Sequence, residues 1–197
     1  MKRMIVVLSI LLSACSMQPK MQQATHPVQV EITPGQFVNL PQPKELQQNV
    51  NVSQLITAQW GEANQQQMLT QLQVDQEKVV LAGFSAWGVK LLSLTYLGED
   101  GGNKIETNVI AGFADKLPQP EQVLFNVMLS IWPKSSWDKP LAAIGWKLKE
   151  TALQRLLIDQ NGKVVVTIDY QKKTHLDGKI TFKHQGLNYT VIIETKA

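Results

Sequence analysis

Apolar and polar side chains alternate with a period of two over most of the chain from about residue 49 to the end. In the run 68–74 the even positions hold methionine, threonine, leucine and valine, while the odd positions are mostly glutamine. The runs 164–170 and 187–193 repeat the pattern, and Asn161–Gly162 before the first of them is typical of a two-residue turn with positive φ at both positions. Strands with one buried face and one solvent-exposed face, joined by such turns, indicate an antiparallel meander.

Two runs depart from simple alternation because they are apolar on both faces in places. They cover residues 79–87 and 91–96. Such runs are typical of central strands that are covered on both sides, and equally of strands whose second face lines a cavity. The sequence leaves both interpretations open. The candidates for a cavity lining in these runs are Phe84, Leu92 and Leu94.

One helix is indicated at 121–132, between Pro120 and Pro133. Proline suits the first turn of a helix, and Glu121 complements the positive end of the helix dipole. Apart from one narrow stripe of polar residues the helix is apolar all round, so it must be covered on more than one side. We expect it in the mouth of a curved sheet. The side chains expected to face inward are those of Phe125, Met128 and Trp132.

Residues 1–14 have the layout of a bacterial lipoprotein signal peptide, with basic residues, a short apolar stretch, and leucine, serine and alanine before Cys15. We expect cleavage before Cys15 and attachment of a diacylglycerol to its thiol, with acylation of the new amino terminus, because two or more acyl chains anchor a protein stably. The alternative is an ordinary secretory signal with a chance cysteine. Because Ser16 rather than an aspartate follows, we expect a lipid anchor on the periplasmic face of the outer membrane.

Residues 15–48 are rich in glutamine and proline and contain little apolar surface to bury. We expect a lipidated flexible tether with a mean reach of about 30 Å. Within it, 28–32 alternates and fits a short docked strand. Residues 49–197 are long enough for a single domain. Since Cys15 is the only cysteine, this domain must fold without an internal disulfide.

Charge is nearly balanced but unevenly distributed. Removal of the signal peptide leaves 17 basic and 16 acidic side chains, which argues against a nucleic-acid partner. Residues 16–138 carry a net charge of −4, whereas 139–197 carry +5. Either solvated strand faces differ by chance, or a basic side turns toward anionic lipid headgroups.

No constellation in the sequence predicts catalysis. Residues 83–87 approach a nucleophile-elbow pattern, but Trp87 replaces the glycine that its tight turn requires. The three histidines form no metal-binding pattern, and the loops rich in aspartate and glycine lack the ligand series of a calcium site. We therefore expect no enzyme activity, no metal and no cofactor.

Residues 91–98 and the strand expected from Ile105 resemble the outer-membrane lipoprotein receptor of the lipoprotein localisation pathway, as do the signal, tether and short apolar helix. The resemblance implies an open half-barrel plugged by helices, in which a protruding leucine before a glycine touches the membrane and helps to deliver lipid. Leu97 is the matching position. The match is incomplete, because Tyr96 stands where the receptor has a proline and residues 100–103 lengthen the loop.

Short motifs from about Val50 to the end also resemble a small bacterial lipoprotein family of unknown function that is encoded with aryl-polyene synthesis genes. These motifs carry no catalytic residue, so the resemblance implies a fold better than an activity. They lie at 94–98, 131–133, 145–146 and 169–170.

These observations predict a mostly antiparallel α+β fold, a curved half-barrel sheet with covering helices. We expect an outer-membrane lipoprotein that binds an acyl or polyene lipid chain and assists its transfer or insertion. Its expected partners are the outer-membrane bilayer, the lipid or polyene ligand and a periplasmic carrier protein. The expected cavity lining is Phe84, Leu92, Leu94, Phe125, Met128 and Trp132, and the expected membrane contact is Leu97.

The alternative is a structural or assembly lipoprotein without a cavity, which binds a protein partner through a sheet edge or the region of Trp132 and Trp146. In that case the same apolar side chains are packed core, their default role at these spacings.

Overall fold

The computed structural model describes residues 26–61, 64–111 and 119–196, so the expected signal peptide and Cys15 lie outside the described residues. Ten strands in these ranges form one antiparallel sheet with the order β7-β6-β5-β4-β3-β12-β11-β10-β9-β8. The strands are β3 (Val50–Trp60), β4 (Asn64–Val74), β5 (Lys78–Phe84), β6 (Lys90–Leu97), β7 (Lys104–Val109), β8 (Lys147–Glu150), β9 (Gln154–Ile158), β10 (Val164–Tyr170), β11 (Lys179–His184) and β12 (Tyr189–Lys196).

The chain builds the sheet as two meanders that meet in the middle. It starts at β3 and moves outward to β7, then crosses to β8 and returns strand by strand to β12, which pairs with β3. Strands β7 and β8 stand at the two ends of this order, so the sheet is open rather than closed. The expected curved antiparallel half-barrel with covering helices is confirmed.

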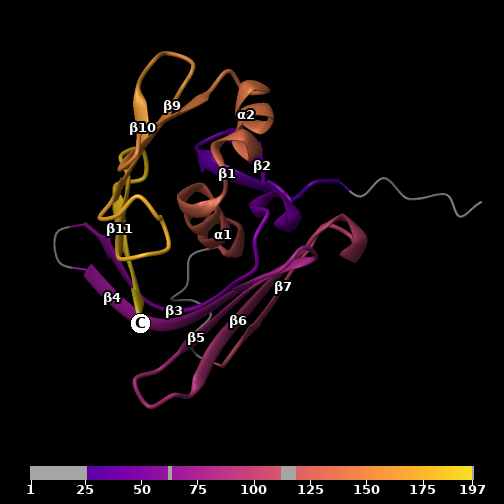
Figure 1. Cartoon of the computed structure of the whole chain (residues 1–197), viewed down its shortest axis with the longest axis vertical. Helices are drawn as coiled ribbons and strands as arrows, with labels where there is room; N and C mark the ends of the chain where they lie inside the picture. The colour runs from indigo at the N-terminus through magenta and orange to yellow at the C-terminus, as the bar shows by residue number, and fades with distance from the viewer. Residues whose placement is uncertain (1–25, 62–63, 112–118, 197) are drawn as a thin grey trace, which may run out of the picture.

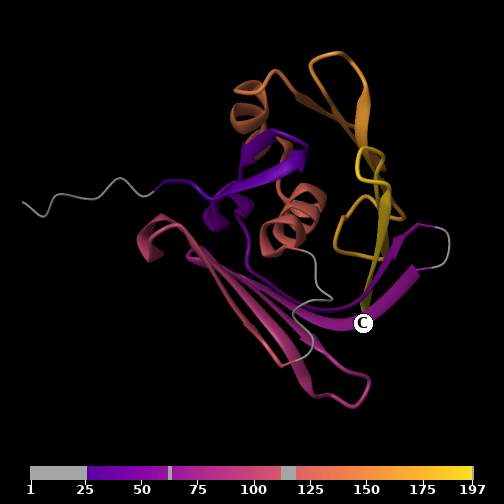
Figure 2. The ribbon, with the colours of Figure 1, turned by 180° about the vertical axis from the view of Figure 1, so that it is seen from behind.

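Figure 1 shows the sheet bent around α1 (Pro120–Ile131), which lies on its concave side. The second helix, α2 (Lys134–Ala142), packs near β8 and β2, and a separate hairpin of β1 (Gln29–Thr33) and β2 (Gln36–Asn39) lies against α1. The reverse view in Figure 2 shows the same arrangement, with the hairpin and α2 above α1. The concave side is therefore filled by helices mainly next to β8–β12.

The first helix has the burial that its composition predicts. All its residues from Leu124 to Ile131 are buried, including the polar Asn126 and Ser130. The Ser130 hydroxyl donates to the Asn126 carbonyl at 2.7 Å, and the Tyr189 hydroxyl donates to the Asn126 side-chain oxygen at 2.7 Å. Because these polar groups are paired inside the core, the polar stripe does not need to face water.

The carbonyl end of α1 is held by a buried arginine. Arg155 on β9 donates through Nη1 to the backbone carbonyls of Leu129 and Trp132, at 2.8 Å each, and through Nε to Glu150 at 2.7 Å. A cation satisfies carbonyls that the helix leaves unpaired and complements its negative dipole end. This contact fixes the helix against β9 and β8.

The later part of the expected tether is folded, contrary to the prediction of a flexible segment up to residue 48. Val30, Ile32, Val38, Leu40 and Leu46 are buried in the core. The segment also accepts hydrogen bonds, since Trp132 Nε1 donates to the Gln42 carbonyl at 3.0 Å and the Ser136 hydroxyl to the Glu45 carbonyl at 3.2 Å. The docked strand expected at 28–32 explains part of the difference, because its alternate apolar side chains gain a buried face. Residues 15–25 lie outside the described residues.

The hairpin expected at Asn161–Gly162 exists between β9 and β10, but its turn differs from the expected two-residue type. Gly162 has a φ of +82°, whereas Asn161 is not among the residues with positive φ. The Asp159 carboxylate accepts the backbone N–H groups of Asn161 and Lys163, at 2.8 Å each. The aspartate therefore closes a longer turn in which glycine alone takes the left-handed conformation.

Candidate functional site

A pocket of about 300 Å³ opens on the concave side of the sheet, between β3–β7 and the first turn of α1. Its apolar lining is Ile56, Ala58, Met68, Leu81, Leu92, Leu94, Val109, Pro120 and Val123. Its polar lining is Gln66, Thr70, Ser93 and Thr107. Among the described residues no charged side chain lines the pocket, and its size and apolar surface are those of small-molecule sites.

Cross-strand register explains why these residues meet. Leu81 pairs with Leu94, and Leu94 with Thr107, so neighbouring strands present side chains to the same face in one row. The next row toward the β5–β6 turn holds Leu92 and Val109. Period-two alternation thus produces a continuous apolar surface under the start of α1.

A glycine shapes the pocket floor. Gly83 on β5 pairs with Thr70 and Leu92, and a Cβ at this position would meet Met68 Sδ and lie 3.0 Å from Leu92 Cγ. The absence of a side chain therefore lets Met68 and Leu92 approach one another over the strand. In the sequence this glycine suggested a nucleophile elbow, and in the structure it lies within a regular strand.

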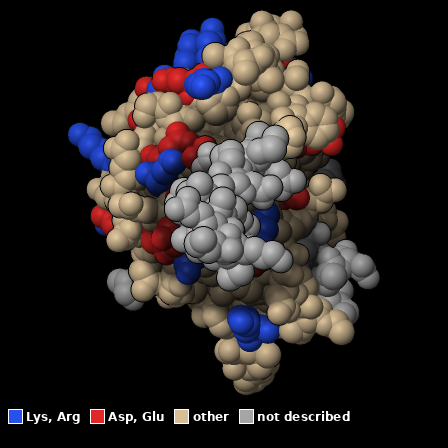
Figure 3. All heavy atoms as spheres, turned by 90° about the vertical axis from the view of Figure 1, so that its right-hand side faces the viewer, with Lys and Arg blue, Asp and Glu red and all other residues tan. Residues whose placement is uncertain are grey.

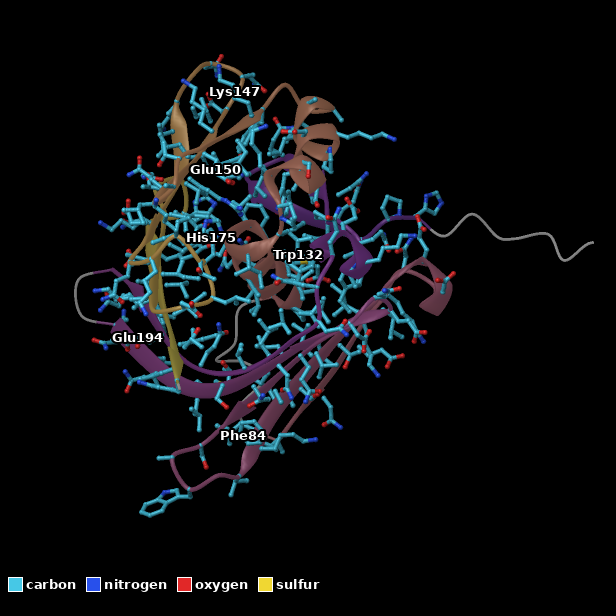
Figure 4. The ribbon with its side chains drawn as sticks, in the orientation of Figure 1. Phe84, Trp132, Lys147, Glu150, His175 and Glu194 are labelled. Carbon is cyan, nitrogen blue, oxygen red and sulfur yellow. The ribbon has the colours of Figure 1, made fainter. Side chains whose placement is uncertain are left out.

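Two of the six expected cavity residues line the pocket and three do not. Leu92 and Leu94 are in the lining, as expected. Phe125, Met128 and Trp132 are fully buried in the core instead. Phe125 packs edge-on against Trp137 at 5.8 Å between ring centroids, and Figure 4 shows Trp132 inside the molecule beside the helices. The helix faces inward as expected, but these side chains fill space rather than enclose it.

Phe84, the sixth expected cavity residue, lies on the opposite face of the sheet. It pairs with Leu69 on β4, whose neighbours Met68 and Thr70 point into the pocket. Successive side chains alternate between faces, so Leu69 and Phe84 point outward. Leu69 is accordingly 43% exposed. The apolar run that suggested two buried faces thus has one face toward the pocket and the other on the outer side of the sheet.

Leu97 ends β6 at the far end from Leu92 and is half-buried. The loop after it turns back as a short 3-10 helix, η2 (Glu99–Gly101), and a Cβ on Gly101 would lie only 2.7 Å from Leu97 Cβ. The glycine-rich loop therefore folds back against Leu97. The membrane contact at Leu97 stays a prediction.

Sequence reasoning missed most of the lining. Ile56, Met68 and Val109 lie on three different strands, and Val123 lies on the helix. The alternation at 68–74 placed Met68 and Thr70 on a buried face, which was the available signal. Their proximity to β6 and β7 depends on register, which a single sequence does not specify.

Hydrogen bonds hold the start of α1 above the sheet. Gln122 Nε2 donates to the Tyr189 hydroxyl on β12 at 2.9 Å, and that hydroxyl donates to Asn126. Burial is the main cause that raises the pKa of Tyr189, and it keeps the phenol protonated as a donor. This network sets the height of Val123, one residue further along the helix, over the pocket.

Within the described ranges, no group of three or more histidine, cysteine, aspartate or glutamate side chains is placed to hold a metal ion. Neither helix there is long and apolar enough to cross a bilayer. What the pocket offers is apolar contact with a few uncharged hydrogen-bonding groups.

Comparison with known proteins gives a family and a structural likeness. No curated protein matches the chain. The crystal structure of a LolA superfamily protein from Nitrosomonas europaea is similar over 77% of this chain and 85% of that one, with 6% sequence identity and a TM-score of 0.41. A family model described as "Protein of unknown function (DUF3261)" matches residues 51–197, so the chain belongs to this family.

Proposed function

We propose that this protein is a membrane-anchored lipoprotein that binds an acyl or polyene lipid chain and assists its transfer or insertion at the outer membrane. The observation that supports this best is the open pocket of about 300 Å³ between β3–β7 and α1, in which the described lining residues are uncharged. The alternative, a structural lipoprotein without a cavity, does not account for this pocket.

The lining favours a hydrocarbon chain over a polar ligand. Each methylene group moved from water into such a site gains about 0.8 kcal/mol. A charged ligand would lose its hydration without meeting an opposite charge among the described lining residues, because none of them is charged. The polar groups of Thr70 and Thr107 suit a single uncharged or hydrogen-bonding atom on an otherwise apolar ligand.

The anchor and its place in the cell rest on the sequence. The signal ending at Cys15 supports lipidation, and Ser16 supports the outer membrane. A protein held at the bilayer by its amino terminus would take up or release a lipid without crossing bulk solvent. The family resemblance to aryl-polyene lipoproteins supports a polyene as one ligand class.

The test is binding of a fluorescent fatty acid to the full chain, with one variant that fills the pocket. Thr107 lies on the edge strand β7, points into the pocket and is exposed, so Thr107→Trp adds bulk without entering the core. Asn108→Trp is the matched control, because the next residue on the same strand faces the other way. Both variants should keep the parental melting temperature.

We expect Thr107→Trp to weaken binding roughly tenfold or more, a loss of about 1.4 kcal/mol, and Asn108→Trp to leave it unchanged. Absence of binding in the parent, or equal affinity in both variants, would overturn the proposal.

A further inference from the structure

The turn between β5 and β6 presents apolar side chains to solvent at the end of the sheet where the pocket lies. Trp87 is 92% exposed and Val89 is 57% exposed, the two highest values among the exposed large apolar residues of the described chain. The turn projects at the lower end of Figure 1, away from both helices. Exposing an indole so fully leaves a large apolar area in water, so this turn is an unusual surface feature.

This exposure belongs to a well-formed turn. The Ser85 hydroxyl accepts the backbone N–H groups of Trp87 at 3.3 Å and Val89 at 3.2 Å, and Ser85 and Val89 also pair through their backbones at 2.9 Å. Gly88 takes a φ of +76°, a conformation that favours glycine. The hydrogen bonds hold Trp87 outward as part of a defined hairpin.

Other exposed apolar residues surround the same turn. The backbone N–H of Ile110 donates a hydrogen bond to the Leu91 carbonyl at 3.0 Å, so Ile110 lies beside the base of the hairpin. Leu69 on β4 pairs with Phe84 on the neighbouring strand β5. Both are among the exposed large apolar residues. Together with Trp87 and Val89 they form an apolar tip, which is the name used below for these four residues.

Among the described residues of the β5–β6 turn, the charge is of one sign. Between Phe84 and Leu92 the only ionisable side chain is Lys90, which is exposed at the start of β6. On the face shown in Figure 3, the lower end of the molecule is uncharged apart from Lys or Arg atoms, whereas acidic and basic groups mix higher up. An indole beside a lysine suits the interface of a bilayer, where the ring sits at headgroup level and the ammonium meets phosphate.

The apolar tip lies at the end of the sheet next to the pocket, although Leu69 and, by alternation, Ile110 point to the opposite face. Leu92 and Val109 line the pocket. Leu92 is two residues after Lys90, and Val109 directly precedes Ile110. A bilayer in contact with the tip would therefore face the end of the pocket that these two residues form.

We propose that the apolar tip is a bilayer-contacting element, which inserts Trp87 at the lipid interface and sets the pocket against the membrane. The occupant is a lipid surface with anionic headgroups. This inference adds an orientation at the membrane to the proposed lipid-binding function. The biological purpose of the contact rests on that proposed function, whereas the contact itself is measured without ligand. One competing orientation turns the basic strands β8–β12 toward the bilayer, and another turns Leu97, at the opposite end of β6, toward it.

The experiment measures tryptophan emission from the full chain reconstituted in vesicles of phosphatidylethanolamine and phosphatidylglycerol, with and without brominated acyl chains. Subtracting the spectrum of Trp87→Phe from that of the parent isolates the Trp87 emission, because the other tryptophans are common to both. A second reporter, Leu153→Trp in the Trp87→Phe protein, places an indole at an exposed apolar position between β8 and β9. Both reporters are held at the membrane by the same chain, so their difference reports orientation.

We expect Trp87 emission to shift to the blue and to lose most of its intensity with brominated lipid, while the reporter at 153 stays unquenched. Trp87 emission that is unshifted and unquenched would overturn the proposal, as would quenching confined to the reporter at 153. A blue shift without lipid that grows with protein concentration would show self-association instead and would also overturn it. Fatty-acid binding by Trp87→Phe should equal that of the parent, so loss of the proposed function is recognised separately.

Discussion

Two regions of the same concave sheet face are filled in different ways. Over β9–β12 the face is covered by α1, and Ile168, Ile180 and Phe182 are fully buried beneath it. We call this the packed region. Over β3–β7 the helix contributes Pro120 and Val123 to the pocket lining, and Met68 and Leu92 remain half-exposed around the pocket. We call this the pocket region.

The difference comes from helix length and position. An α-helix rises about 1.5 Å per residue, so the 12 residues of α1 cover only part of a ten-stranded sheet. Arg155 fixes the carbonyl end of the helix over the packed region. Its amino-terminal turn therefore ends above the pocket region without filling it. A sheet with one periodic apolar face thus provides both a core and a candidate binding site.

The largest expected effect is in the packed region. Arg155→Ala should lower the free energy of unfolding by about 3–5 kcal/mol, because it leaves helix carbonyls unpaired and a carboxylate without its partner. Glu150→Gln is the milder control, with an expected loss of about 1–2 kcal/mol from one charge-assisted hydrogen bond. Urea denaturation measures both, and equal losses would contradict the capping role of Arg155.

The next effect depends on pH and on His184, which joins the packed region to β1. Burial is the main cause that lowers the pKa of His184 to about 4, and its Nε2–H donates to the Ile32 carbonyl at 2.9 Å. The unfolded chain therefore binds the proton more readily than the folded protein. Stability is fully present above a pH of about 6.5 and falls as the pH drops toward 4, by up to about 3 kcal/mol.

Thermal melts across this pH range measure the effect. His184→Gln should remove most of the dependence and leave the part due to His175, whose pKa is also lowered, mainly by burial. If His184→Gln retains the full acid sensitivity of the parent, the neutral buried imidazole is not its cause.

A smaller effect separates the two regions directly. Met128 is fully buried, so Met128→Trp should overpack the core and lower stability by about 1–3 kcal/mol while leaving fatty-acid affinity unchanged. Calorimetry and ligand titration on the same sample measure both quantities. Loss of fatty-acid affinity without loss of stability would show that Met128 lines the cavity rather than the packed core.

The sequence predicted the fold well because the relevant signals are local. Alternation along 68–74 and 164–170 specified strands with one buried face, and the prolines at 120 and 133 bracketed a helix. The amino-terminal segment was misjudged, because Val30, Val38 and Leu46 are spaced by polar and proline residues and gain burial only from distant partners. Local composition does not report such long-range packing.

The site was less predictable for the same physical reason. Leu92 and Leu94 were identified because their strand is strongly apolar, but whether Met128 or Met68 meets them depends on register and helix placement. Phe84 was assigned to the pocket face. It directly follows Gly83 on the same strand, so alternation puts the two residues on opposite faces of the sheet. The sequence placed Trp87 at the end of an apolar run and as a departure from a motif, and its exposure became visible in the folded hairpin.

The central claim is that the pocket region holds a lipid chain, and the most direct measurement is mass spectrometry of the natively expressed full chain. The spectra should show a bound lipid or polyene in the parent and in Asn108→Trp, and its loss from Thr107→Trp. A parent without any bound apolar molecule, or a Thr107→Trp protein that retains it in full, would contradict the account.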